Sequence, residues 1–160
     1  MWKWIRHFKA LKPPARELFL RASVLLPLVS ATLPWRGFRK TKASLEHFLP
    51  AVCGSESLDA QPRAALVAEM VCAAAHYGIG RPSCLEQSLV LWWLLARQGI
   101  ASDLRVGVRK HEGNFEAHAW VECGGTILSD LEAEHRHFAA FDAALASLPS
   151  EPRRDGKVTD

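Results

Sequence analysis

Residues 83–86 read Ser83-Cys84-Leu85-Glu86, and an apolar run follows them. A serine followed three residues later by a glutamate, ahead of an apolar run, is the capping-box pattern of a helix N-terminus. The pattern predicts that Ser83 is the N-cap and that Cys84 is the first helical residue. The thiol would then face unpaired backbone N–H groups and the positive end of the helix dipole, which favour the thiolate form. The stretch therefore predicts a nucleophilic cysteine at the start of a helix.

The length and composition of the chain fit a single globular domain. Its 160 residues are enough to bury a core without disulfides or metal ions. Hydrophobic residues make up 49% of the chain, which argues against a disordered protein. We expect one domain over residues 1–150, with a basic helical lead-in over 1–42 and a charged, frayed tail over 151–160.

The four cysteines indicate a reducing compartment. They are too few and too scattered for a disulfide framework in a chain of this size. Cys53 and Cys72 fall in apolar or helical surroundings, where a free cysteine behaves as a small buried hydrophobe. The cytoplasm is therefore the expected location.

The N-terminal quarter of the chain is strongly basic. Residues 1–42 hold ten lysines and arginines but only one acid, Glu17. A solvated basic surface is the simpler interpretation, and an acidic partner or an anionic membrane surface is the alternative. The longest uncharged stretch, Ala22 to Trp35, has 14 residues, fewer than the roughly 20 that span a bilayer. We expect a soluble protein that binds no nucleic acid, and peripheral membrane contact is the less favoured alternative.

Apolar spacing and alternation predict helices followed by an antiparallel sheet. The expected helices are Ala15–Ser30 (kinked at Pro27), Ser44–Val52 after a connector at Gly37, Arg63–His76, Leu85–Arg97 and Phe138–Leu148. The expected strands are 104–108, 117–123 and Thr126–Leu131. Helices gathered ahead of antiparallel strands indicate an α+β fold.

An apolar stripe in the first helix allows two interpretations. Its members are Leu18, Phe19, Leu25, Leu26 and Val29. Core packing against the helix at 63–76 is the commoner outcome for such a stripe. The alternative is an exposed docking face, flanked by arginines, for a partner protein or a membrane surface.

The strand at 117–123 carries a histidine, His118, on the face opposite its small apolar residues. Its relation to Asp130 depends on the hairpin turn. A two-residue Gly124-Gly125 turn would pair Cys123 with Thr126 and direct Asp130 to the wrong face. A three-residue loop would pair Glu122 with Thr126 and place His118 opposite Asp130, with Gly125 in the left-handed position that such loops require. We expect the three-residue loop, because its glycine fits and because opposed Cβ atoms lie about 4.5–5.5 Å apart.

These residues would form a Cys–His–Asp triad. Asp130 would fix the tautomer of His118, whose other ring nitrogen would hold the proton of Cys84. The backbone N–H of Cys84 and its helix neighbours would stabilise a developing oxyanion. A second oxyanion donor is not evident, because Gln61 is too distant in the sequence to be assigned.

Other interpretations of the same residues are weaker. Cys84 could simply pack at a helix start. A zinc site made of Cys84, His118 and Cys123 lacks the paired ligand spacing of known zinc sites. A phosphate site lacks a glycine-rich loop. We expect neither a metal nor a cofactor.

Two segments of the chain resemble a known enzyme family. They are Ser83-Cys84-Leu85-Glu86-Gln87-Ser88-Leu89 and Phe115-Glu116-Ala117-His118-Ala119-Trp120-Val121-Glu122, and Leu128-Ser129-Asp130 follows them. The region of about 81–131 resembles the transglutaminase-like cysteine peptidases of bacterial lasso-peptide biosynthesis, which cut the leader from the precursor peptide. The resemblance implies a papain-like α+β fold and a triad at Cys84, His118 and Asp130.

The resemblance also implies partners. Some members are fused to a small leader-recognition domain, whereas residues 1–80 here read as helical. The implied form is a standalone peptidase that acts on the precursor peptide with a separate leader-binding protein and an ATP-dependent cyclase. Two alternatives stay open: an acyltransferase of the same superfamily, and a non-catalytic peptide-binding module on that fold.

Overall fold

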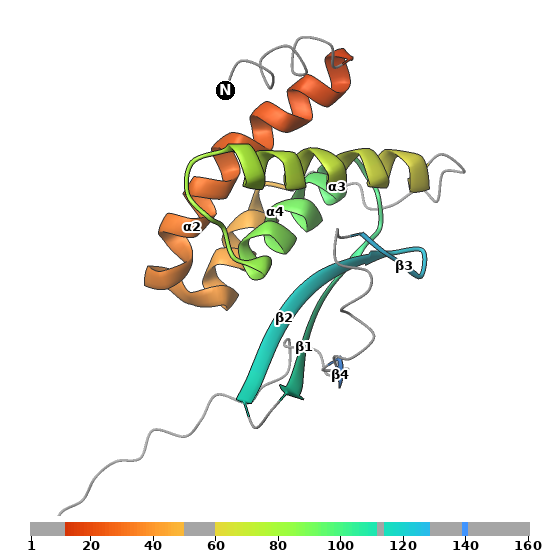
Figure 1. The fold of residues 1–160 in the computed structure, drawn as a ribbon. Helices are drawn as coiled ribbons and strands as arrows, with labels where there is room; N and C mark the ends of the chain where they lie inside the picture. The colour runs from red at the N-terminus through yellow and green to blue at the C-terminus, as the bar shows by residue number, and fades with distance from the viewer. Residues whose placement is uncertain (1–11, 50–59, 112–113, 129–138, 141–160) are drawn as a thin grey trace, which may run out of the picture.

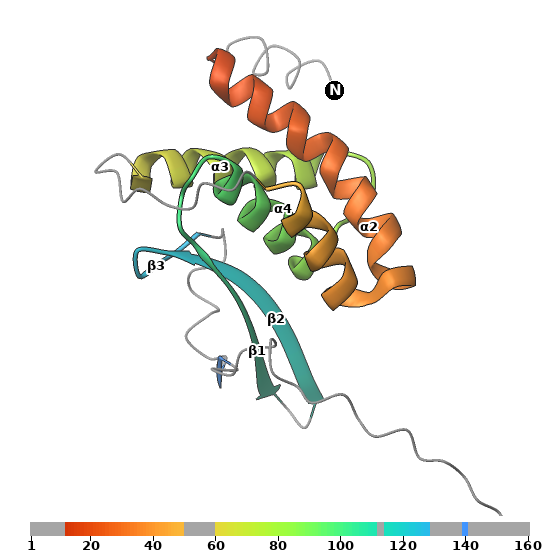
Figure 2. The same ribbon diagram turned by 180° about the vertical axis from the view of Figure 1, so that it is seen from behind.

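The computed structural model describes residues 12–49, 60–111, 114–128 and 139–140, and it shows helices on one side of a small sheet (Figures 1 and 2). The helices are α2 (Pro13–His47), α3 (Ala60–Tyr77) and α4 (Cys84–Arg97). The strands are β1 (Asp103–His111), β2 (Asn114–Cys123), β3 (Thr126–Ile127) and β4 (Ala139–Ala140). They form an antiparallel sheet in the order β3-β2-β1-β4. The predicted α+β fold is confirmed.

Helix α2 is longer than predicted. It runs from Pro13 to His47, and Gly37 is its one non-helical residue, with φ 72° and ψ 166°. Glycine takes a positive φ without steric cost, so the chain bends there and the helix resumes at once. The break predicted at Gly37 is therefore confirmed, because Gly37 separates two helical segments. The second segment follows Gly37 directly and ends at His47, so the bounds predicted for a separate helix over 44–52 are wrong as far as residue 49, and 50–52 lie outside the described residues. Pro27 and Pro34 lie within the helix, where each removes one backbone donor without ending it.

The predicted apolar stripe of α2 is part of the core. Leu18, Phe19, Leu26 and Val29 are buried in one cluster with residues of α3 and α4, and Leu25 packs against it. This outcome confirms the core interpretation of these five residues. The docking alternative for the same set is wrong.

By length and composition alone, helix α2 is long and apolar enough to cross a membrane. This differs from the expectation based on the uncharged stretch, because an 18-residue segment of the helix is apolar on average even though it may include up to two charged residues. Only 28% of that segment is buried within the molecule. A core helix can be equally long and apolar, so the finding describes the helix rather than a location.

The long strands pair as the alternation predicts. Leu104 lies opposite Val121, and Val106 lies opposite Ala119, so one face of the β1–β2 pair is apolar. Val121 and Ala119 are buried, and α4 packs on β2. The sheet thus covers the helix that begins at Cys84.

The hairpin between β2 and β3 has a different turn from the predicted one. Cys123 pairs with Thr126, so Gly124 and Gly125 form a two-residue turn. Their φ angles are 55° and 77°. Positive φ at both positions is typical of a type I′ turn, whose twist matches that of the flanking strands. The predicted pairing of Glu122 with Thr126 is wrong, because Glu122 pairs with Ile127.

The end of the sheet also departs from expectation. Ladder pairing of β3 ends at Ile127, after which the N–H of Leu128 donates to the carbonyl of Val121 at 2.8 Å. Residues 139–140 form β4 rather than the start of the predicted helix over 138–148, and they pair with Gly107 and Val108 of β1. This pairing gives the outer edge of β1 backbone partners that it would otherwise lack. The rest of the predicted helix, like residues 129–131 of the predicted strand, lies outside the described residues.

Candidate active site

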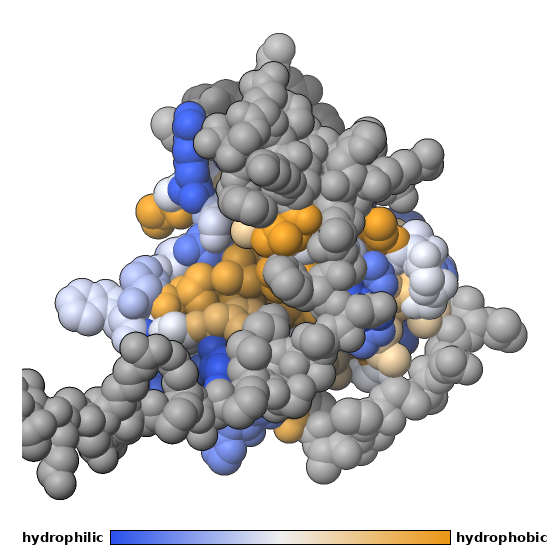
Figure 3. Space-filling model, turned by 90° about the horizontal axis from the view of Figure 1, so that it is seen from below, coloured by the Kyte–Doolittle hydropathy of each residue, from blue (hydrophilic) through white to orange (hydrophobic). Residues whose placement is uncertain are grey.

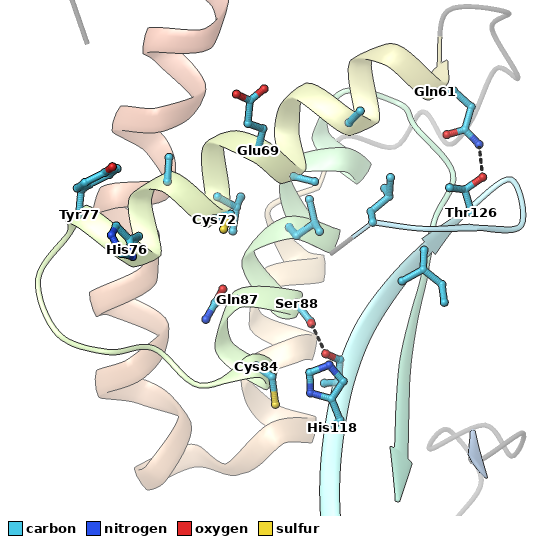
Figure 4. Close-up of a pocket in the computed structure, with 18 residues that line it drawn as sticks. Gln61, Glu69, Cys72, His76, Tyr77, Cys84, Gln87, Ser88, His118 and Thr126 are labelled. Carbon is cyan, nitrogen blue, oxygen red and sulfur yellow. Dashed lines mark hydrogen bonds between the residues drawn. The ribbon is translucent and has the colours of Figure 1, made fainter. Parts of the chain in front are cut away.

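A cleft of about 950 Å³ lies between α3, the start of α4 and the β2–β3 hairpin (Figure 4). Apolar surface is also visible at the centre of the molecule when it is seen from below, with hydrophilic residues beside it (Figure 3). The polar and sulfur-bearing residues that line the cleft are Gln61, Glu69, Cys72, His76, Tyr77, Cys84, Gln87, Ser88, His118 and Thr126. Two predicted site residues, Cys84 and His118, are among them.

Cys84 is the first residue of α4, and the predicted capping box is present. The side chain of Ser83 accepts from the N–H of Glu86 at 3.4 Å, and the Glu86 carboxylate accepts from the N–H of Ser83 at 2.7 Å. The N–H groups of Cys84 and Leu85 have no acceptor among the described residues. Two donors at the positive end of the helix dipole are therefore available beside the half-buried thiol.

Bonds from outside the helix fix its first turn. The hydroxyl of Ser30 on α2 donates to the Glu86 carboxylate at 2.9 Å. The side-chain amide of Gln87 donates to the carbonyl of Pro82 at 2.9 Å, which ties the preceding loop to the helix. The backbone around Cys84 is thus held by contacts to α2 and to its own loop.

His118 lies on β2, next to Cys84 in the close-up (Figure 4). Ser88, one turn after Cys84, donates from its hydroxyl to the carbonyl of Ala119 at 2.9 Å. This buried bond connects the cysteine helix to the strand residue that follows His118. The structure therefore brings the predicted cysteine and histidine to one cleft.

A row of side chains supports the imidazole on its strand face. The ring of His118 stacks on that of Trp120, with centroids 6.2 Å apart and planes inclined by 18°. The indole N–H of Trp120 donates to Glu122 at 2.8 Å, and Glu122 pairs with Arg105 of β1 at 3.3 Å. The sequence places these residues on the face of His118 but gives no sign of the stacking. Aromatic stacking restricts the orientation of the imidazole.

Asp130 lies outside the described residues. The predicted pairing of Asp130 with His118 required a three-residue loop, whereas the turn between β2 and β3 has two residues. The role of Asp130 stays a prediction that rests on the family resemblance.

Gln61 reaches the site although its position in the sequence gave no reason to expect it. Its side-chain N–H donates to the carbonyl of Cys123 at 2.9 Å and to the hydroxyl of Thr126 at 3.3 Å. The amide thus joins the start of α3 to the hairpin at the edge of the cleft. No local pattern signals this contact, because 62 residues separate Gln61 from Cys123.

The cysteines of the described region have different surroundings. Cys123 is 4% exposed in the core, and burial raises the pKa of its thiol. Cys72 lines the cleft from α3.

The alternative zinc site of Cys84, His118 and Cys123 is not assembled, because Cys123 belongs to the core cluster and does not line the cleft with the other two residues. Over the described ranges, no group of three or more His, Cys, Asp or Glu side chains is placed to hold a metal ion.

Comparison with known proteins identifies the family of the chain. A family model described as Transglutaminase-like superfamily, Transglut_core3, matches residues 25–141. This range includes α3, α4, both long strands and the cleft. Neither the curated proteins nor the solved structures give a match to this chain.

Proposed function

Because this chain belongs to the transglutaminase-like superfamily, whose members are commonly cysteine-dependent enzymes, we propose that it is a cysteine peptidase. The observation that carries the proposal is Cys84, at the capped start of α4, beside His118 in one cleft. A thiol beside a histidine and free helix N–H groups is the arrangement that nucleophilic catalysis requires.

The proposed reaction is hydrolysis of a peptide bond in two steps. His118 takes the proton of Cys84, and the thiolate attacks the carbonyl carbon. The N–H groups of Cys84 and Leu85 bind the oxyanion. The C–N bond then breaks, His118 returns the proton to the leaving amine, and an acyl-enzyme remains. In the second step His118 accepts a proton from water, whose oxygen attacks the acyl carbon. The C–S bond then breaks, the acid leaves, and His118 returns the proton to the sulfur of Cys84.

We propose the leader of a lasso-peptide precursor as the substrate. The support is the resemblance of the segments around Cys84 and His118 to lasso-peptide leader peptidases. The cleft agrees with a peptide substrate, because it is lined by apolar side chains of α3 and α4 together with polar ones such as Glu69 and Gln87. A separate leader-binding protein and an ATP-dependent cyclase in the cytoplasm complete this proposal, and Asp130 would orient His118. No cofactor is needed for this chemistry.

The test is cleavage of a purified precursor, followed by mass spectrometry with the leader-binding protein present. Cys84→Ala should abolish release of the leader. Cys72→Ala, which removes a second thiol from the same cleft, is the matched control and should retain cleavage. If Cys84→Ala still releases the leader, the assignment of the nucleophile is wrong.

Acyl transfer is the second candidate, because the superfamily includes acyltransferases as well as peptidases. An acyl-enzyme on Cys84 could pass its acyl group to an amine instead of water. Incubation with hydroxylamine or a primary amine separates the two reactions. A stable conjugate in place of a free acid would favour transfer.

A non-catalytic peptide-binding module on the same fold is a third candidate. If a thiol-reactive probe labels Cys84 no faster than Cys72, the site is such a module.

A further inference from the structure

Helix α2 carries a second apolar stripe that the core does not cover. Its members are exposed to unusual degrees for large apolar side chains: Leu20 54%, Val24 68%, Leu28 55% and Trp35 90%. The first three are four residues apart, and Trp35 follows Leu28 by seven, so at 3.6 residues per turn they share one face. We call these four residues the outer stripe.

The outer stripe lies opposite the buried face of the same helix. The buried residues Ala15, Leu18, Phe19, Ala22, Leu26 and Val29 face α3 and α4. At 100° per residue, Ala22 and Leu26 point about 160° away from Val24. A helix at the surface of a soluble protein normally has one apolar face and one polar face. The outer face is apolar apart from the exposed Glu17–Arg21 ion pair at its N-terminal end, and so many exposed large apolar side chains indicate a partner beyond the described residues.

The charges near the outer stripe identify what covers it. Arg36, Arg39 and Lys40 follow Trp35 and are exposed. Residues 1–42 hold ten lysines and arginines and a single acid, Glu17, which pairs with Arg21. Apolar side chains bordered by cations are typical of helices that lie in an anionic membrane surface. Tryptophan favours that interface, where its ring is half in lipid and its N–H in water.

We propose that the outer stripe docks α2 flat on the surface of an anionic lipid bilayer. The helix lies on the membrane rather than crossing it, because its inner face is packed: Ala22 is 0% and Val29 2% exposed. None of the described residues that line the cleft belongs to α2. Docking therefore leaves Cys84 accessible to a substrate from solution.

The experiment is co-sedimentation of the full-length protein with vesicles. Wild-type protein should bind vesicles of phosphatidylcholine and phosphatidylglycerol, and bind vesicles of phosphatidylcholine alone much less. The variant Leu20→Ser/Val24→Ser/Leu28→Ser should bind these vesicles at least about tenfold more weakly, because it lacks three apolar side chains that the bilayer would bury. All three positions are more than half exposed, so the variant should fold, and its circular dichroism melt checks this.

A matched control removes two exposed apolar residues elsewhere. Phe48 and Ile79 are 68% and 86% exposed and lie outside the outer stripe. Phe48→Ser/Ile79→Ser should therefore bind vesicles like wild type. Trp35→Phe should remove most of the blue shift in tryptophan fluorescence that vesicles induce.

Three results would overturn the proposal. The first is wild-type protein that stays in solution with anionic vesicles. The second is binding that survives in the folded triple variant, since another surface would then bind the lipid. The third is a wild-type dimer that becomes monomeric in the triple variant without any vesicle binding, which would make a second copy the occupant.

Discussion

The hydroxyl of Ser88 donates to the backbone carbonyl of Ala119 at 2.9 Å, and this bond joins the helix of Cys84 to the strand of His118. Ser88 is 6% exposed, so water could not readily replace its hydroxyl as the donor to the Ala119 carbonyl. This buried bond, between residues 31 apart in the chain, therefore helps to set the separation of the two proposed catalytic residues, beside the packing of α4 on β2.

Ser88→Ala should therefore lower both stability and activity. Leaving a buried carbonyl without its donor costs about 1–3 kcal/mol. Urea unfolding measures the first effect and kcat measures the second. Ser23→Ala is the control, because the Ser23 hydroxyl bonds to Phe19 within a single helix. If both variants lower kcat equally, the bond does not position the site.

Removal of the N-cap should destabilise α4. Ser83→Ala should lower the free energy of unfolding by about 0.5–2 kcal/mol, because the N–H of Glu86 loses its acceptor. Ser83→Asp retains a capping oxygen and should stay close to wild type. Thermal and urea unfolding check both values. Equal stability of the alanine and aspartate variants would contradict the role of the cap.

The histidines of the cleft should differ sharply in importance. His118→Ala should abolish cleavage, because it removes the proposed base. His76→Ala is the matched control, since His76 lines the same cleft from α3, and it should have a small effect. Asp130→Asn should lower kcat less than His118→Ala does, because the imidazole remains but is poorly oriented. The kcat of each purified variant decides these points, and equal losses at His76 and His118 would contradict the assignment.

The buried thiol of Cys123 should affect stability at high pH. Burial raises the pKa of this thiol in the folded state above its ordinary value of 9.0, so folding opposes ionisation. Its contribution to stability is fully present below the unfolded pKa, and stability falls as the pH rises from about 9 through the folded pKa. Melting temperatures of wild type and Cys123→Ala across this range test the sign. The difference in melting temperature between wild type and Cys123→Ala should narrow as the pH rises. A difference that widens would contradict the raised pKa of Cys123 in the folded state.

The local features of the site could be predicted from the sequence. The capping box requires residues three apart, and the strand faces require alternation, so both are visible in a short window. Cys84 at the helix start and His118 opposite the apolar face of β2 follow from these patterns. Helix α4 begins at Cys84, as the capping box predicts, and ends at the predicted Arg97.

Longer-range features could not be predicted. Gly124 and Gly125 allow either turn, and the choice depends on the twist of two strands that the sequence does not display. The pairing of residues 139–140 with Gly107 and Val108 joins segments far apart in the chain. On α2, the spacing of apolar residues indicated a core-facing stripe, but the exposure of Leu20, Val24 and Leu28 depends on how the helices pack, which the sequence does not display.

The hydrogen bonds of Gln61 limit how far the tip of the β2–β3 hairpin can move at the edge of the cleft. At the tip of the hairpin, Gly124, Gly125 and Thr126 are exposed, and the exposed amide of Gln61 is their described hydrogen-bond link to α3. A hydrogen bond of this kind contributes about 1 kcal/mol, far below the free energy of global unfolding. The tip can therefore swing away from α3 in a local fluctuation while α3 and α4 stay folded.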